Sequence, residues 1–173
     1  MSELLEQKLL KDFENSFNQR YKREMVRWVE EGEFDYFVTL TFKDNEITEY
    51  MACRALKLFN IWVNRGAFTN QGVKKGRRVL MMPFIEENAW HGYHFHIFVK
   101  IPDDITDNHI KRIMQYSWCR LDEAGEIPFS DKDKSNNHKW FIPIYHAGRL
   151  SKYVLKQSTN LKIDNLVADL IWK

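Results

Sequence analysis

Apolar residues recur every three or four positions in several segments of the chain, and this spacing predicts α-helices. The first segment covers residues 3–31, where most apolar side chains lie four positions apart, and Gly32 ends it. The same spacing predicts helices over residues 48–66 and 107–121, and a further helix that begins after Gly148.

Other segments alternate between apolar and polar residues, or are apolar throughout, which is typical of β-strands. They cover residues 35–43, 78–87, 92–101 and 139–145, and the middle two form a hairpin. The order strand, helix, strand, strand, helix, strand predicts an α+β fold of the split βαββαβ, ferredoxin-like or RRM-like class. Its antiparallel sheet carries both crossover helices on one face, and we expect the other face to be free. The N-terminal helix is an addition to this arrangement.

Length and composition indicate one globular domain over residues 1–173, because a hydrophobic content of 44% in 173 residues suffices for a single core. No segment has the apolar length of a membrane span, and the N-terminus lacks a signal-peptide pattern. Cys53 and Cys119 do not make a disulfide framework. We therefore expect a soluble, cytoplasmic protein with no membrane partner.

The charge balance restricts where a nucleic acid could bind. Because 26 basic residues face 24 acidic ones, for a net charge of +2, any nucleic-acid site must be local. The densest basic run contains Lys74, Lys75, Arg77 and Arg78 and follows Gly72 in a turn-like context. It predicts a loop that grips phosphates, with a solvated loop before a strand as the equally weighted alternative.

Strand parity identifies the side chains on the sheet face that the helices leave uncovered, because successive side chains point to opposite faces. In residues 92–101 and 35–43, one parity is apolar throughout and faces the helices. The opposite parity contributes His94, His96, Phe98 and Lys100 from the first of these strands and Phe37, Thr39 and Thr41 from the second.

His94 and His96 share one side of one strand, which places two imidazoles close enough to bind a single cation. A bare His-x-His is more often a pair of surface histidines. Glu86 and Glu87, at the end of the partner strand, change this balance, because a carboxylate there completes a three-ligand site open to substrate. Parity does not choose between the two glutamates, since both faces of residues 79–85 are apolar.

The last predicted helix places Tyr153 and Lys156 on a common face, with Arg149 one turn before the tyrosine. A phenol is a poor nucleophile at its ordinary pKa of about 10, and a nearby cation lowers that pKa. Alone, Tyr-x-x-Lys more often belongs to an amphipathic helix with a partly exposed tyrosine. Its weight comes from its order after the histidine pair.

Taken together, these segments resemble the three motifs of the HUH endonucleases, a family of rolling-circle replication initiators, relaxases and certain transposases. The first motif is similar to the strand Phe37-Val38-Thr39-Leu40-Thr41-Phe42, the second to His94-Phe95-His96, and the third to Tyr153-Val154-Leu155-Lys156. The resemblance covers a catalytic core over residues 35–158. It leaves out an N-terminal helical extension, residues 1–31, and a C-terminal tail, residues 159–173.

The resemblance implies a metal site of Glu86, His94 and His96, because a glutamate about eight positions before the first histidine often completes it in the family. It implies that Tyr153 attacks a DNA phosphate, giving a 5′-phosphotyrosine and a free 3′-hydroxyl, while Lys156 offsets developing charge. Mn²⁺ or Mg²⁺ suits this chemistry, whereas Zn²⁺ would bind tightly without turning over. We expect weaker nucleic-acid contacts from Thr39, Thr41, Lys74, Lys75, Arg77, Arg78, Trp90 and Arg149.

The expected function is initiation of rolling-circle replication of a plasmid, phage or single-stranded DNA virus, acting on single-stranded DNA or an origin hairpin. The chain contains no phosphate-binding Gly-x-x-x-x-Gly-Lys loop, so a host helicase and polymerase are expected partners. Two alternatives stay open. One is a transposase or mobilisation nuclease with the same site; the other is a non-catalytic RRM-like binder that stacks bases on Phe37 and Phe98.

Overall fold

The computed structural model describes most of the chain between residues 23 and 145. The described residues are 7, 16, 19–20, 23–44, 46–88, 92–122, 124 and 140–145.

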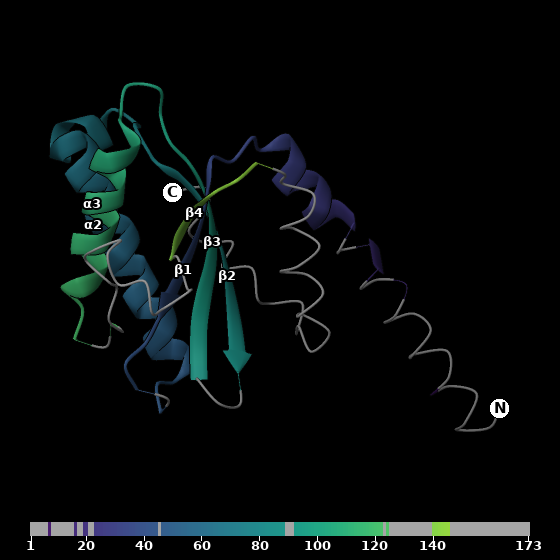
Figure 1. Cartoon of the computed structure of the whole chain (residues 1–173). Helices are drawn as coiled ribbons and strands as arrows, with labels where there is room; N and C mark the ends of the chain where they lie inside the picture. Colours follow the sequence, from purple (N-terminus) through teal and green to yellow (C-terminus); the bar gives the residue numbers. More distant parts are fainter. Residues whose placement is uncertain are drawn as a thin grey trace.

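Four strands form one antiparallel sheet at the centre of the molecule (Figure 1). They are β1 (Tyr36–Thr41), β2 (Leu80–Asn88), β3 (Gly92–Lys100) and β4 (Phe141–Pro143). The spatial order is β2-β3-β1-β4, so the hairpin strand β3 lies between β1 and β2. This order and these directions confirm the predicted ferredoxin-like sheet.

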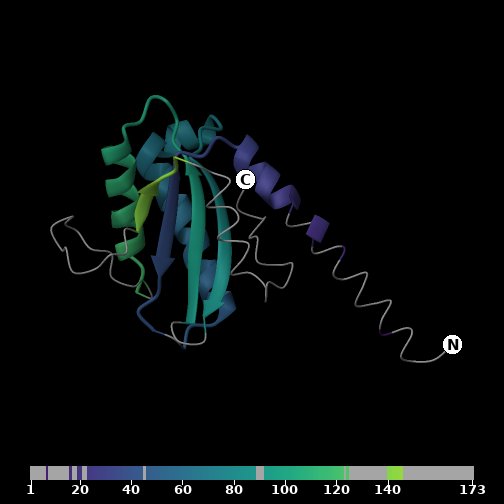
Figure 2. The ribbon, with the colours of Figure 1, turned by 45° about the vertical axis from the view of Figure 1, so that its right-hand side comes forward.

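Two helices cover one face of this sheet, α2 (Glu49–Lys74) and α3 (Asp107–Cys119). Figures 1 and 2 show them side by side on the same side of the strands. Each helix connects two strands of the sheet, as expected for two split βαβ units.

The main core lies between the sheet and these two helices and confirms the predicted parity. Val38 and Leu40 of β1 and Phe95, Ile97 and Val99 of β3 are fully buried there, each at 0% exposure. The residues of opposite parity in both strands point to the second face of the sheet.

Hydrogen bonds at both ends of β1 fix α3 against the sheet. The Tyr36 hydroxyl donates to Asp107 Oδ2 over 2.5 Å, and the Trp118 indole Nε1 donates to the Thr41 carbonyl over 3.2 Å. Partial burial, followed by this bond to a carboxylate, raises the pKa of Tyr36 to about 12. The phenol therefore stays protonated and keeps donating across the neutral pH range.

Helix α2 extends past the end that the sequence pattern predicts. Gly66 lies inside it, the backbone kinks at Thr69 (φ 59°, ψ 170°), and Gly72 lies in the helical turn beyond the kink. The turn-like context expected at Gly72 is therefore wrong. At Gly66 the absence of a side chain lets α3 approach, since a Cβ there would lie 2.8 Å from Ile113 Cγ2. Thr48 begins the helix, and its hydroxyl accepts a hydrogen bond from the Met51 amide.

The second face of the sheet is not free, contrary to the sequence expectation. Residues 23–31 are helical, and Met25 and Val29 from this segment are buried against the sheet. They form a second apolar cluster, whose other buried members are Phe34, Phe37, Met82, Phe84 and Phe98. Residues 23–31 are thus part of the fold and cover part of this face.

Within the described part of the chain, none of the helices has the length and apolar character required to cross a membrane.

Candidate metal centre

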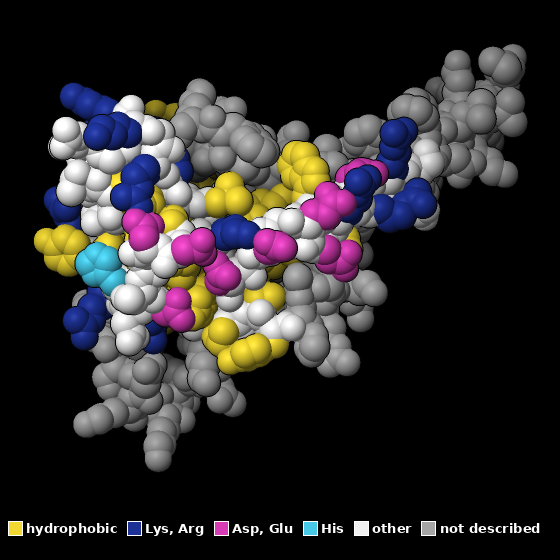
Figure 3. Space-filling view, turned by 90° about the horizontal axis from the view of Figure 1, so that it is seen from above, with side chains coloured by type: hydrophobic (Ala, Val, Ile, Leu, Met, Phe, Trp, Pro, Cys, Tyr) yellow, Lys and Arg dark blue, Asp and Glu magenta, His cyan; other side chains and the backbone are white. Residues whose placement is uncertain are grey.

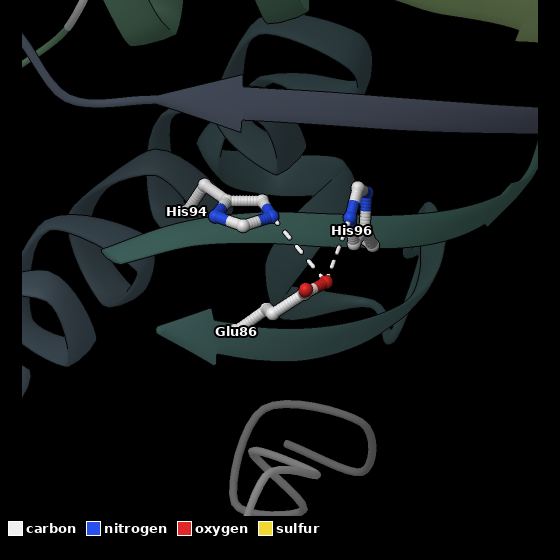
Figure 4. A group of neighbouring side chains, drawn as sticks. All are labelled: Glu86, His94 and His96. Atoms are coloured by element: carbon white, nitrogen blue, oxygen red, sulfur yellow. Dashed lines mark ion pairs between the residues drawn. The ribbon is translucent and has the colours of Figure 1, made fainter. Parts of the chain in front are cut away.

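The hairpin register brings a carboxylate and two imidazoles together on the second face of the sheet. Glu86 of β2 lies directly opposite His94 of β3, and His96 lies two positions further along β3. Because residues two apart in a strand share a face, all three side chains point the same way. Figure 4 shows Glu86 reaching from β2 toward both imidazole rings.

The three side chains converge through one carboxylate oxygen. Glu86 Oε2 lies 3.4 Å from His94 Nε2 and 3.2 Å from His96 Nε2, and the three potential ligand atoms all lie within 4.8 Å of one another. The imidazoles are largely buried, with side-chain exposures of 13% and 10%, whereas Glu86 keeps 21%. We call this group, Glu86, His94 and His96, the triad.

The register also decides between the two candidate glutamates. Glu87 pairs with Tyr93 and is exposed, so its side chain points away from the face that carries the imidazoles. Among the described residues, Glu86 is the carboxylate that completes the group.

The electrostatics of the triad favour a charged carboxylate on Glu86 beside a neutral imidazole on His94. The hydrogen bond from His96 lowers the pKa of Glu86 against the opposing effect of its partial burial. Burial, and then the neighbouring His96, lowers the pKa of His94. Both shifts favour the protonation states that ligate a cation, because a metal ligand must offer a free lone pair.

Two residues of β1 support His96 from behind. Thr39 Oγ1 lies 3.2 Å from His96 Nδ1, and the Phe37 ring stacks on the imidazole with centroids 5.2 Å apart and planes 18° from parallel. Nδ1 of His96 contacts the threonine hydroxyl, and Nε2 of the same ring is directed toward Glu86. Contacts of this kind fix the tautomer and ring orientation of metal-binding histidines.

The donor set fits a divalent cation. Two imidazole nitrogens and one carboxylate oxygen are suitable ligands for transition metals, and three protein ligands leave coordination positions open for substrate. The triad can therefore hold a metal ion. These donors do not by themselves select one metal.

The other predicted site residues divide into two groups. Thr41 is exposed at the end of β1 opposite His94, on the same face as the triad. Tyr153, Lys156, Arg149 and Trp90 lie outside the described residues, so their placement near the triad stays a prediction.

The basic run begins at the end of α2 and continues as the predicted loop before β2. Lys74 is the last residue of α2 and Lys75 its C-cap. The Arg77 guanidinium forms an ion pair with Asp104 and lies over the Phe68 ring, while Arg78 donates to the Val73 carbonyl. Both arginines are thus engaged by the protein itself, and phosphate binding by this run stays a prediction.

The burial of Phe37 and Phe98 removes the stacking platform that the RRM-like alternative needs. Their exposures are 4% and 0%, because both rings pack in the second apolar cluster. The expectation that these two aromatics stack on bases is therefore wrong.

Sequence reasoning missed the supporting role of Phe37 and the packing of residues 23–31 on this face of the sheet. A signal was present in the apolar character of both faces of residues 79–85, because a strand with two apolar faces has to be covered on both sides.

Comparisons with models of protein families, with curated proteins and with solved structures each found no match to this chain.

Proposed function

We propose that this protein nicks and rejoins single-stranded DNA through a covalent bond between Tyr153 and a DNA 5′-phosphate, with a divalent ion, Mn²⁺ or Mg²⁺, held by the triad. The reaction serves the initiation of rolling-circle replication. The family is that of the single-tyrosine HUH endonucleases, whose motif order the chain follows.

One observation carries the proposal: the convergence of Glu86, His94 and His96 within 4.8 Å on one sheet face. Three ligating side chains from two strands meet there without a fourth ligand, counting the described residues only. Structural zinc sites normally close with four ligands, whereas catalytic sites keep positions open. Such an open site suits the binding of a phosphate oxygen.

The surroundings of the triad also favour catalysis over a purely structural role. The His96 ring is held by Thr39 and Phe37, so the triad is ordered before substrate arrives. A divalent ion at this site supplies positive charge that polarises the scissile phosphate and lowers the pKa of the attacking phenol.

The chemical step is a transesterification whose atoms balance without ATP. The Tyr153 phenolate oxygen forms a bond to phosphorus, and the bond between phosphorus and the 3′-oxygen breaks. The electron pair leaves on the 3′-oxygen, which takes up a proton and becomes the free 3′-hydroxyl. Lys156 neutralises charge that develops on the phosphate. The reverse attack by a 3′-hydroxyl rejoins the strand and releases Tyr153.

The experiment is adduct capture on a denaturing gel. The protein is incubated with a random-sequence pool of end-labelled single-stranded oligonucleotides, in Mn²⁺ or in EDTA. The label is expected to migrate with the protein in Mn²⁺ and not in EDTA, and Tyr153→Phe and Glu86→Gln are each expected to abolish it. Glu87→Gln is the matched control and should retain the adduct, because its side chain points away from the triad.

An adduct that forms equally in EDTA would contradict the metal-dependent mechanism. An adduct that survives in Tyr153→Phe would contradict the nucleophile. The absence of any adduct from the random pool, with Mn²⁺ bound by the protein, would contradict the nicking activity itself.

A further inference from the structure

A pocket with two arginines lies in the helix layer, on the side of the sheet opposite the triad. It occupies about 400 Å³ between α2 and α3. Its lining residues are Trp62, Arg65, Gly66, Ile113, Tyr116, Ser117 and Arg120. None of the functions assigned above uses it.

The close approach of the two helices forms the pocket. Ile113 of α3 packs against Gly66 of α2. A side chain at position 66 would collide with it, because a Cβ there would lie 2.8 Å from Ile113 Cγ2. Beside this contact, the Arg120 guanidinium lies over the Trp62 ring at 4.6 Å and 5.5 Å from the Tyr116 ring centroid. Stacking on two aromatic rings holds the Arg120 guanidinium at the pocket rather than in bulk water.

Both arginines of the pocket carry charge that no carboxylate of the described residues neutralises. Across the described residues, neither Arg65 nor Arg120 forms an ion pair, and no acidic residue lines the pocket. Two guanidinium groups at one small pocket repel each other unless an anion lies between them. The pocket is thus built for an anionic group.

The helix layer as a whole carries an excess of positive charge. Residues 49–74 and 107–120 contain seven basic and two acidic side chains, a surplus of five, against +2 for the entire chain. The remainder of the chain is therefore net acidic. Figure 3 shows Lys and Arg side chains around the side formed by α2 and α3, and Asp and Glu gathered across the middle.

We propose that the pocket between α2 and α3 binds the phosphate backbone of a nucleic-acid strand through Arg65 and Arg120. One guanidinium group can bind two oxygens of the same phosphate. Tyr116, which is 66% exposed, offers a ring face on which a base can stack. Arg112 is exposed on α3 and adds positive charge to the same helix layer.

The pocket and the triad lie on opposite sides of the sheet, so a strand in the pocket is not the segment being cut. The choice of nucleic acid as occupant rests on the proposed function, whereas the affinity of the pocket for phosphate does not. The pocket holds DNA that flanks the nick.

The test measures binding without cleavage. A fluorescein-labelled single-stranded oligonucleotide is titrated with the full chain in EDTA, at several salt concentrations, and anisotropy gives the affinity. The variant is Arg65→Gln with Arg120→Gln, and the matched control is Arg54→Gln with Lys57→Gln, which removes the same charge from exposed positions of α2 outside the pocket. Arg120→Lys keeps the positive charge and removes the stacked guanidinium, so it tests whether charge alone maintains the affinity for the oligonucleotide.

The pocket variant is expected to bind about tenfold more weakly, with a salt slope reduced by about one, whereas the control pair should lose much less. Equal losses in both pairs would overturn the proposal in favour of diffuse attraction, and no loss in the pocket variant would overturn it outright. Binding of thymidine monophosphate as tight as that of the oligonucleotide would also overturn it, by indicating a nucleotide site.

Two measurements keep this outcome separate from the proposed nicking activity. Thermal melting by circular dichroism verifies that the pocket variant is folded, since Arg120 also packs on Trp62. Adduct formation with Tyr153 is assayed on the same variants. Weakened binding of the pocket variant alongside an intact adduct supports the pocket. An unmodified protein that binds the oligonucleotide but forms no adduct contradicts the nuclease, and the comparison of the pocket and control variants then still decides the pocket.

Discussion

Thr39 and His96 face each other across β1 and β3, with Thr39 Oγ1 3.2 Å from His96 Nδ1. When His96 ligates an ion through Nε2, Nδ1 carries the proton and donates it to the threonine hydroxyl. The hydroxyl can accept this proton, so the contact is compatible with the tautomer that a metal ligand needs, and it also fixes the plane of the ring.

Replacing Thr39 with valine keeps the shape of the side chain and removes this hydrogen bond. Thr39→Val is expected to weaken Mn²⁺ binding about tenfold or more, since partners of ligating histidines contribute about 10–100-fold to metal affinity. Isothermal titration of the metal-free protein with Mn²⁺ measures the change. Thr41→Val is the matched control on the same face of β1 and should leave the affinity close to that of the unmodified protein. Equal affinities for Thr39→Val and the unmodified protein would show that the hydroxyl plays no part.

The two adjacent glutamates of β2 provide a second matched pair. Glu86→Gln removes the carboxylate that lies 3.2 Å and 3.4 Å from the two imidazoles and is expected to weaken Mn²⁺ binding by more than about a hundredfold, beyond the range of supporting residues. Glu87→Gln should leave it unchanged, because that side chain lies beside Tyr93. The same titration decides the matter, and a larger loss from Glu87→Gln would contradict the observed register.

The lowered pKa of His94 predicts how the metal-free protein responds to acid. Glu86 and His96 are the titratable groups that face it. In the unfolded chain His94 regains an ordinary pKa of about 6.5, so the unfolded state binds more protons below that pH and the free energy of unfolding falls. The lowered pKa of Glu86 adds to the loss below its ordinary value of 4.5.

Urea unfolding in EDTA at pH 7.5 and pH 5.5 measures this effect. The free energy of unfolding of the unmodified protein is expected to be smaller at pH 5.5 than at pH 7.5. In His94→Gln the difference between these two free energies should be smaller. If the difference stays the same in His94→Gln, the buried imidazole is not its source.

The packing of residues 23–31 on the sheet predicts that this segment contributes to stability. Met25 is 5% exposed in the second apolar cluster, so Met25→Ala should lower the free energy of unfolding by about 2 kcal/mol or more. Glu30→Ala, at an exposed position of the same segment, should change it by less than about 0.5 kcal/mol. Chemical denaturation of both variants provides the comparison, and similar stabilities for the two would mean that the segment does not dock.

Much of the fold follows from the sequence because strand parity is a local property. The alternation in residues 92–101 placed Phe95, Ile97 and Val99 in the core and the two histidines opposite, and the structure agrees. Strand parity alone could not choose between Glu86 and Glu87. The choice depends on the hairpin register, which the connecting turn sets.

The errors have a common physical origin in tertiary contacts. Gly66 and Gly72 have low helix propensity and suggested an early end to α2, yet the close packing of Ile113 against Gly66 requires a residue without a side chain. The second face was expected to be free because the docking of Met25 and Val29 is a long-range contact that periodicity does not report.

Peptide mapping of the covalent adduct identifies the residue that is bonded to the DNA. The adduct formed in Mn²⁺ is digested with nuclease and protease, and mass spectrometry locates the nucleotide that remains. We expect a nucleotide phosphate on the peptide that contains Tyr153, and none on any peptide of the Glu86→Gln sample. A phosphate on a different residue, or cleavage of the DNA with no nucleotide on any peptide, would contradict the proposed mechanism.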